Sequence, residues 1–342
     1  MMKVLFIGGT GLISTAVSRQ AIADGIDLYL LNRGGRVQSD LNAATLIRAD
    51  INQEEDVAAA LEGMRFDAVV DWIAFTPDAV ERDLRLFRGR TDQYIFISSA
   101  SVYQKPASHY LTTESTPLGN PYWPYAQNKI ACEERLIEAW RQEGFPVTIV
   151  RPTLTYGESM IFAPMSSWQH PWSLIDRMRR GEKIIVPGDG SSLWVSTHNS
   201  DLARGLVGLF GNPQTLGHAF HITSDEALTV NQMFEIIARA AGATPNLIHI
   251  ASDFIIACEP ALRGDLMGDK IHSTVFDNSK IKRFVPDYVA KVPLHRGIER
   301  SMAWFAAHPE ACTVDEQWNA MCDRIIAAYE VGLAAIGTHD RS

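Results

Sequence analysis

Tyr125 and Lys129 are the residues whose spacing most clearly predicts chemistry. They stand four residues apart in the run YAQNK at 125–129, which places a phenol and an ammonium group on one face of a helix. A tyrosine is a poor base near neutral pH because its ordinary pKa is about 10. A nearby positive charge favours the tyrosinate, so the pair predicts a Tyr125 base whose pKa is lowered by Lys129. The alternative is a surface helix with a solvated lysine.

A second hydroxyl group is expected close to this pair. Ser98, Ser99 and Ser101 follow the apolar segment 93–97, which is typical of a buried strand that ends at the serines. A hydroxyl at Ser99 could hold a substrate oxygen while Tyr125 takes or gives its proton. The alternative for these serines is ordinary turn chemistry at a strand end.

A glycine turn near the N-terminus predicts the partner that such chemistry needs. An apolar strand at 3–7 runs into Gly8-Gly9-Thr10-Gly11, and an amphipathic helix at 12–24 and a second strand at 26–31 follow. A strand, glycine turn, helix and strand form a βαβ unit, whose helix N-terminus favours a pyrophosphate. Gly8 would let the chain turn off the strand, and Gly11 would let the backbone approach the phosphates. The alternative is a tight turn of any α/β protein.

The end of the second strand bears on which dinucleotide is bound. An NAD-binding domain usually has an acidic residue there, to bind the ribose 2′-hydroxyl. This chain has Asn32 instead, followed by Arg33 and Arg36. Arginines suit a 2′-phosphate, so the sequence favours NADP over NAD. The alternative is that the two arginines only cover a loop.

Alternating strands and helices predict the fold class. Further strands are expected at 45–49, 66–73, 93–97 and 147–150, with helices at 54–64, 77–88 and 125–143 between them. Asn52 is the expected cap of the first of these helices. The pattern predicts an α/β protein with a Rossmann-type, doubly wound parallel sheet. After residue 156 the sequence becomes irregular and aromatic, and helices are expected at 174–180, 229–241, 294–308 and 316–335, with short strands between them.

Composition limits the remaining classes of function. The chain has 342 residues, is 46% hydrophobic and has a net charge of −9, which argues against a protein built mainly to hold a phosphate backbone. Its four cysteines have neither disulfide nor metal spacing. We find no metal-binding pattern, no leader segment and no run of membrane-spanning length, so we expect a cytoplasmic location.

Taken together, the motifs resemble those of an extended short-chain dehydrogenase/reductase of the NAD(P)-dependent epimerase/dehydratase family. The matching segments are GGTGLIS at 8–14, ADI at 49–51, ISSASVY at 97–103, YAQNK at 125–129, RPTLTYG at 151–157, GDG at 188–190, HNSDLA at 198–203 and the stretch 220–242. The resemblance implies a Rossmann domain at 1–157 with a returning segment at about 190–225. It implies a smaller C-terminal α/β substrate lobe at 158–189 and 226–342, and by analogy a homodimer formed through the helix that begins at Tyr125.

The resemblance also implies roles for individual residues. Ser99, Tyr125 and Lys129 form the implied catalytic group, Asp50 and Ile51 would hold the adenine, and Pro152 and Thr153 would lie beside the nicotinamide. The full cofactor-binding set that we predict is Gly8, Thr10, Gly11, Leu12, Ile13, Asn32, Arg33, Arg36, Asp50, Ile51, Ser98, Tyr125, Lys129, Pro152 and Thr153.

Three departures from the family pattern bear on the reaction and its substrate. Ser14 replaces a glycine, a mild change. Ala100 and Ser101 stand where sugar dehydratases carry an acid pair, so elimination chemistry is disfavoured. Trp194 stands where nucleotide-sugar enzymes often have an arginine that pairs a pyrophosphate. Trp194 is therefore either core or a wall that stacks on a sugar-like ring.

These observations predict an NAD(P)-dependent epimerase or dehydrogenase/reductase that acts at a secondary alcohol of a sugar or sugar-like small molecule. The predicted substrate contacts are Ser99, Ser101, Trp168 and Trp194. The alternative is a non-catalytic or RNA-binding relative of the same fold, similar to the chloroplast stem-loop-binding proteins. The net charge and the intact Ser99, Tyr125 and Lys129 set argue against that alternative.

Overall fold

A parallel sheet organises the first half of the chain. The computed structural model describes residues 1–34 and 39–337. Within those ranges the largest sheet has seven strands in the order β12-β7-β5-β4-β1-β2-β3, and every pairing is parallel. The strands are β1 (Lys3–Ile7), β2 (Asp27–Asn32), β3 (Thr45–Arg48), β4 (Ala68–Asp71), β5 (Tyr94–Ile97), β7 (Val147–Arg151) and β12 (Ala219–His221). From β1 the chain first adds β2 and β3 on one side and then β4, β5, β7 and β12 on the other. This reversal of strand order is that of a doubly wound sheet, so the predicted Rossmann-type sheet is confirmed.

Helices cover both faces of this sheet, because the side chains of each strand point alternately to opposite sides. Val4 and Phe6 pack in one core cluster with α1 and α6, whereas Leu5 and Ile7 pack in another with α2, α3 and α4. The helices are α1 (Leu12–Ala23), α2 (Glu54–Ala60), α3 (Pro77–Phe87), α4 (Pro124–Glu143) and α6 (Asn199–Val207). Parallel strands feeding such helices bring the strand C-termini to one edge, where ligands of this fold bind.

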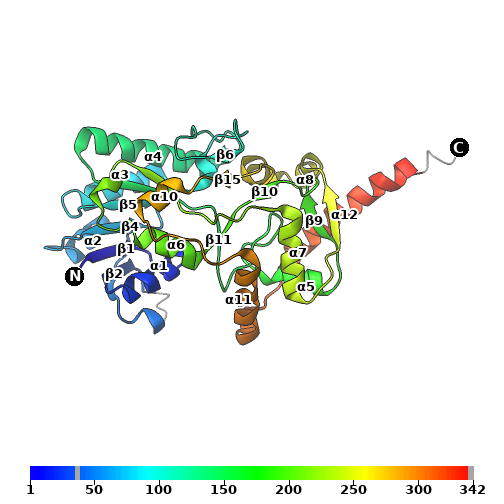
Figure 1. Cartoon of the computed structure of the whole chain (residues 1–342), viewed down its shortest axis with the longest axis horizontal. Helices are drawn as coiled ribbons and strands as arrows, with labels where there is room; N and C mark the ends of the chain where they lie inside the picture. Colours follow the sequence, from blue (N-terminus) through cyan, green and yellow to red (C-terminus); the bar gives the residue numbers. More distant parts are fainter. Residues whose placement is uncertain (35–38, 338–342) are drawn as a thin grey trace.

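A second group of elements lies at the other end of the molecule (Figure 1). There β9 and β14 pair in parallel, and two apolar clusters pack α5, α7, α8, α11 and α12 around them. The bounds are β9 (Ile184–Pro187), β14 (Leu247–Ile250), α5 (Trp172–Arg179), α7 (Val230–Ala241), α8 (Ser252–Cys258), α11 (Leu294–Ala307) and α12 (Glu316–Gly337). The α12 helix, drawn in red, ends far from the central sheet.

Short strands connect the two groups. They pair β6 with β15, β8 with β11 and β10 with β13. Their bounds are β6 (Leu111–Thr112), β15 (Val275–Phe276), β8 (Leu154–Tyr156), β11 (Ser196–His198), β10 (Leu193–Trp194) and β13 (Leu228–Thr229). The domain limits at 1–157, 190–225 and the remainder stay a proposal. One short helix within 226–342, α10 (Ser279–Phe284), packs through Ile281 against the cluster that contains Val4 and Phe6.

Three local features differ from the sequence expectation. The N-cap of α2 is Gln53 and not Asn52. The Asn52 side-chain oxygen instead accepts a hydrogen bond of 2.9 Å from Arg82. The C-terminal region contains the short helices α8, α9 (Arg263–Asp265) and α10 in addition to the two long ones expected there. A π-turn, Leu266–Lys270, follows α9 directly. These pieces are too short for hydrophobic periodicity to reveal.

Candidate active site

The glycine turn places β1 against α1 in a geometry that only glycine accommodates well. Gly8 and Gly9 have φ of 100° and 93°, in the left-handed region. A β-carbon on Gly9 would lie 2.6 Å from Cδ2 of Leu30, so the turn also requires the absence of a side chain. The Ser18 hydroxyl donates to the Gly9 carbonyl at 3.0 Å and holds the turn on the helix.

The N-terminus of α1 opens toward a cleft. Gly11 is the N-cap, and its N–H donates to the Ser14 hydroxyl at 2.8 Å. The serine in place of a third glycine is therefore a cap and does not obstruct the turn. The N–H groups of Leu12 and Ile13 are in the first helical turn and have no intrahelical acceptor, so they fit a pyrophosphate.

The residues expected at the adenosine end gather at the end of β2. The Asn32 carboxamide oxygen accepts the Gly34 N–H at 2.8 Å, while its nitrogen is buried without a partner among the residues that the structure describes. Arg33 is exposed, and a β-carbon on Gly34 would lie 3.4 Å from Nε of Arg48. Arg48 is a cation that sequence reasoning missed, because only strand pairing brings β3 beside β2. Arg36 lies outside the described residues.

The segment expected to hold adenine, Asp50 and Ile51, does not form part of the cleft surface. Ile51 is buried in the cluster that also contains Val57. Asp50 accepts the Asn52 N–H at 3.0 Å, and neither Asp50 nor Ile51 lines the cleft described below.

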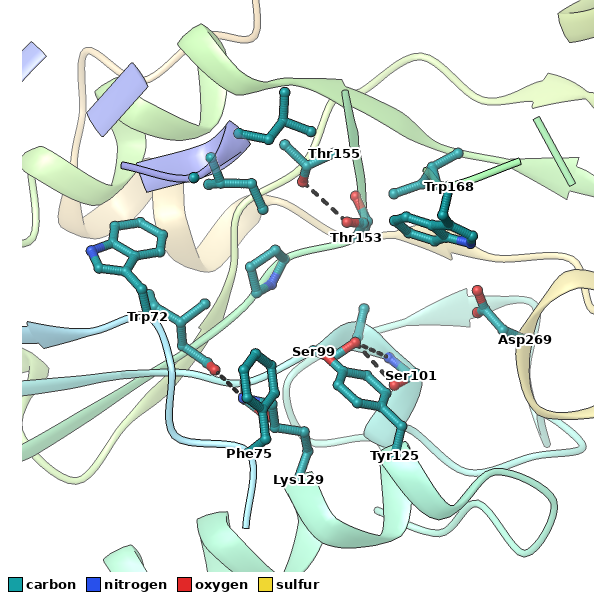
Figure 2. Close-up of a pocket in the computed structure, with 18 of the residues that line it drawn as sticks. Trp72, Phe75, Ser99, Ser101, Tyr125, Lys129, Thr153, Thr155, Trp168 and Asp269 are labelled. Atoms are coloured by element: carbon teal, nitrogen blue, oxygen red, sulfur yellow. Dashed lines mark hydrogen bonds between the residues drawn. The ribbon is translucent and has the colours of Figure 1, made fainter. Parts of the chain in front are cut away.

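Ser99 and Ser101 lie where β5 ends and a single 3₁₀ turn begins. The Ser99 hydroxyl accepts hydrogen bonds from the Ser101 N–H at 3.2 Å and from the Ser101 hydroxyl at 2.9 Å (Figure 2). The serine cluster therefore does serve as a strand-end turn, and the same turn presents Ser99 to the cleft.

Tyr125 is in the first turn of α4 and faces Ser99 (Figure 2). Burial raises the pKa of the Tyr125 phenol above its usual value, and the negative charge of Asp269 acts in the same direction. The hydrogen bond with Ser99 opposes both effects, because it stabilises the tyrosinate. In the free protein the phenol is therefore protonated at neutral pH.

Lys129 is buried one helical turn further along α4. Its Nζ donates to the carbonyl oxygens of Ala74 at 2.7 Å and Ile97 at 2.8 Å, and it lies 4.4 Å from the Phe75 ring centroid. Burial lowers the pKa of Lys129 to about 8. That Lys129 lowers the pKa of Tyr125 stays a prediction. Among the residues that the structure describes, two of the three Lys129 N–H bonds are used, and the third is available for a ligand.

Ser98 lines the cleft, but its hydroxyl is bound to a residue outside the lining. Its hydroxyl donates to Glu133 at 2.5 Å, and Arg151 bonds the same carboxylate through Nε at 3.0 Å and Nη2 at 2.6 Å. All three side chains are buried. This network joins the end of β5 to α4 and β7, so it holds together the elements that carry Ser99 and Tyr125.

Pro152 and Thr153 form the opposite side of the cleft. The Pro152 carbonyl accepts the Ala100 N–H at 2.8 Å, and the Thr153 hydroxyl shares a hydrogen bond of 3.1 Å with Thr197. The first contact ties the segment after β7 to the serine turn, and the second ties it to β11.

One cleft of about 700 Å³ connects these elements. It runs from the glycine turn past Tyr125 to the two predicted tryptophans. Trp168 is 55% exposed, whereas Trp194 is 3% exposed and packs in the core. Trp194 also borders the cleft, and its contact with a substrate stays a prediction. The lining residues that matter for the argument are Gly8, Thr10, Gly11, Leu12, Ile13, Trp72, Phe75, Ser99, Ser101, Tyr125, Lys129, Pro152, Thr153, Trp168, Trp194 and Asp269.

Several lining residues were missed by sequence reasoning, and three of them bear on the argument below. Trp72 and Phe75 follow β4, where the strand-end rule could have found them. Asp269 belongs to the π-turn 266–270, and no local pattern points to it. No three His, Cys, Asp or Glu side chains of residues 1–34 and 39–337 are placed to hold a metal ion.

The fold and cleft define a Rossmann-type dinucleotide-binding protein of the extended short-chain dehydrogenase/reductase type. The model of the NAD dependent epimerase/dehydratase family matches residues 4–223, so the chain belongs to that family. Family and fold support an enzyme that uses an NAD-type cofactor. Within the described residues, no helix is long and apolar enough to cross a bilayer.

Individual relatives are more distant. The chain is 26% identical to the chloroplast stem-loop binding protein of 41 kDa b of Arabidopsis thaliana, over 72% of this chain and 65% of that protein. It is 29% identical to the UDP-glucose 4-epimerase of Lactobacillus helveticus, over 44% of this chain and 51% of that enzyme. The matched regions thus span less than two thirds of either relative.

Among solved structures, the UDP-glucose 4-epimerase of Bifidobacterium longum, in complex with NAD⁺ and UDP, superposes with a TM-score of 0.73. The two chains are 18% identical, and the match covers 91% of this chain and all of the other. At this identity the likeness shows the fold alone.

Proposed function

We propose that the protein is an NAD(P)-dependent oxidoreductase or epimerase that acts at a secondary alcohol of a sugar or sugar-like molecule. The observation that supports this most is the convergence of Ser99, Tyr125 and Lys129 on one wall of the cleft into which the glycine turn opens. A turn, a base and a hydroxyl from three distant segments share one cavity, which chance placement of a Y-x-x-x-K pattern does not explain.

The residues present fit the cofactor. The free N–H groups of Leu12 and Ile13 would hold the pyrophosphate, and the unpartnered nitrogen of Asn32 is a donor for the adenosine ribose. Lys129 would bind the nicotinamide ribose through its remaining N–H, with Pro152 beside the ring. When bound, the oxidised cofactor supplies a hydride acceptor and a positive charge.

The side chains then have separate tasks. Ser99 holds the substrate hydroxyl, since its own hydroxyl is fixed by Ser101 and faces Tyr125. Tyr125 takes the proton of that hydroxyl as its carbon is oxidised. Because burial keeps the phenol neutral in the free protein, base strength is available only when positive charge stands nearby.

The reaction remains open between a dehydrogenase/reductase and an epimerase. The first leaves the carbon oxidised or reduced, and the second restores its hydrogen on the opposite face. Dehydratase chemistry is disfavoured because Ala100 and Ser101 offer no acid for elimination.

Replacement of Tyr125 by Phe tests the assignment. We expect Tyr125→Phe to lose turnover by about 10²- to 10⁴-fold while its affinity for the cofactor is nearly unchanged. The measurement is steady-state reduction of NAD⁺ and NADP⁺ with a panel of sugars and polyols, beside a cofactor titration. Tyr122→Phe is the matched control, since Tyr122 does not line the cleft. Full activity in Tyr125→Phe would overturn the assignment.

Binding of RNA is the second candidate, and the similarity to a chloroplast stem-loop binding protein favours it. The net charge of −9 argues against it. A titration with a structured RNA at two salt concentrations decides: only affinity that survives physiological salt supports this candidate.

Three further properties belong to the proposal. NADP is favoured over NAD by the exposed Arg33 and the neighbouring Arg48. A homodimer is proposed by analogy, through α4 and its neighbour α3, and light scattering would test it. A reducing, cytoplasmic location is proposed because the four cysteines are unpaired.

A further inference from the structure

The far end of the cleft, beyond Tyr125, is where the substrate of the proposed reaction would lie. Trp168 forms part of its wall and packs edge-on against Phe162, with ring centroids 3.8 Å apart. Trp194 lines the same end, and its indole nitrogen is buried with no hydrogen-bond partner in residues 1–34 and 39–337. Broad aromatic faces with few polar groups suit the C–H faces of a ring-shaped polyol.

Asp269 is a charged group that faces this space. Figure 2 shows its carboxylate below Trp168 and across from Ser101 and Tyr125. The Asp269 carboxylate accepts no hydrogen bond from any residue in 1–34 or 39–337, although Asp269 lines the cleft. By contrast, its neighbour Asp265 is paired with Lys270.

The turn that carries Asp269 is fixed to the catalytic wall. Nδ2 of Asn120 donates at 2.8 Å to the Gly268 carbonyl and, also at 2.8 Å, to the Ser101 carbonyl. A β-carbon on Gly268 would lie 2.8 Å from Cβ of Trp123, so the turn packs tightly on the start of α4. The distance between Asp269 and the serine turn is therefore set by the fold. A π-turn at such a place is common at functional sites.

The charges around Asp269 exclude one substrate class. No arginine of the described residues lines the cleft, Lys129 is bound to backbone carbonyls, and Lys270 is paired with Asp265. Lys105 is buried near Asp269 but does not line the cleft. A diphosphate at this end would face two carboxylates with no free guanidinium to bind it.

We propose that Asp269 is a specificity-determining residue: it accepts a hydrogen bond from a hydroxyl or amino group of the substrate, which is a polyol, sugar or amino sugar without phosphate. This inference rests on the proposed function and names the substrate class of that site. The group bound by Asp269 is a different one from the hydroxyl held by Ser99. Trp168 and Trp194 would then contact the faces of the same molecule.

Binding measured without turnover tests the inference separately from the reaction. Tyr125→Phe protein saturated with NAD⁺ or NADP⁺ is titrated with D-glucose, myo-inositol, D-glucosamine and UDP-glucose, with quenching of tryptophan fluorescence as the readout. We expect at least one phosphate-free probe to bind more tightly than UDP-glucose. Adding Asp269→Asn should weaken that probe about tenfold or more, because the acceptor loses the negative charge that strengthens the hydrogen bond. Preference for D-glucosamine over D-glucose would identify an ammonium donor, and the reverse a hydroxyl.

Asp253→Asn is the matched control, because Asp253 is exposed and outside the cleft, and it should change nothing. Cofactor affinity of Asp269→Asn should equal that of the parent, which shows that the variant is folded. Tighter binding of UDP-glucose than of every phosphate-free probe, or an unchanged affinity in Asp269→Asn, would overturn the inference. Full turnover by Tyr125→Phe would instead overturn the proposed function and leave the binding result intact.

Discussion

At the scale of residues, the candidate site contains ionisable groups whose charged forms are destabilised by burial. Tyr125, Lys129 and Asp269 each have a pKa displaced toward the neutral form, and burial is the largest cause in every case. Such pKa shifts are typical of functional sites. The charged forms of the same groups would be more stable in water or beside an opposite charge. Lys129 is only partly compensated by two carbonyls, and Asp269 by no hydrogen bond among the described residues.

Asp269 should make the protein less stable near neutral pH. Burial and Asp265 raise its pKa from 3.8 to about 6, whereas Lys105 and Lys270 act in the opposite direction. The folded state therefore holds this proton up to a higher pH than the unfolded chain, and stability falls as pH rises from about 4 to 6. We expect Asp269→Asn to raise the free energy of unfolding at pH 7 by on the order of 1–3 kcal/mol, and to have little effect at pH 4.

Urea unfolding of both proteins at the two pH values is the measurement. Equal stabilities at pH 7, or a gain of the same size at pH 4, would mean that Asp269 is not held in a costly ionised state.

The residues that sequence reasoning missed share a physical cause. Asp269 is far from Tyr125 in the chain and approaches it only because Asn120 joins the π-turn to the serine turn. No periodicity or motif in the sequence indicates either hydrogen bond of Asn120. Ser99, Tyr125 and Lys129 could be predicted because each stands at a fixed offset from a strand end or helix start.

At the scale of elements, the parallel sheet and its flanking helices were predictable, since buried strands and amphipathic helices leave strong patterns. Gly144 ends α4 in the left-handed conformation, and Thr229 caps α7 by accepting the Gln232 N–H, both as local signals suggest. Asn52 was wrong as a cap because tertiary contact with Arg82 takes its side chain.

The buried network below the site should control the stability of this layer. Glu133 on α4 pairs with Arg151 on β7 and accepts from Ser98 after β5. Glu133→Gln would leave a buried guanidinium without a counter-charge, so we expect it to lower the free energy of unfolding by on the order of 3 kcal/mol.

The matched control is Glu134→Gln, since Glu134 is the adjacent residue on α4 but exposed. It should stay within about 0.5 kcal/mol of the parent. Urea unfolding curves for both variants give the comparison. Similar values for the two would show that the network contributes nothing to the packing of α4 on the sheet.

At the scale of the whole molecule, the cleft lies between the C-terminal edge of the parallel sheet and elements of the C-terminal region. Under the proposed function, the sheet edge would hold the groups that react with the cofactor and the C-terminal elements would contact the substrate. Coverage by the family model ends at residue 223, before the π-turn that carries Asp269. Membership in the family does not identify the substrate, and under the proposal above Asp269, which lies outside the matched range, contributes to its selection.

The most direct test of the account is whether the protein binds a nicotinamide dinucleotide. Purified protein is denatured, the released nucleotide is identified by mass spectrometry, and nucleotide-free protein is titrated with NAD⁺ and NADP⁺. Gly9→Ala should lose this binding because its β-carbon would meet Leu30, whereas Gly25→Ala, which also has positive φ but open space around it, should keep it. We predict that NAD(P) is retained or binds, with NADP favoured. Retention near one per chain would favour an epimerase, and free exchange a dehydrogenase or reductase. Absence of both retained nucleotide and titratable binding would contradict the account.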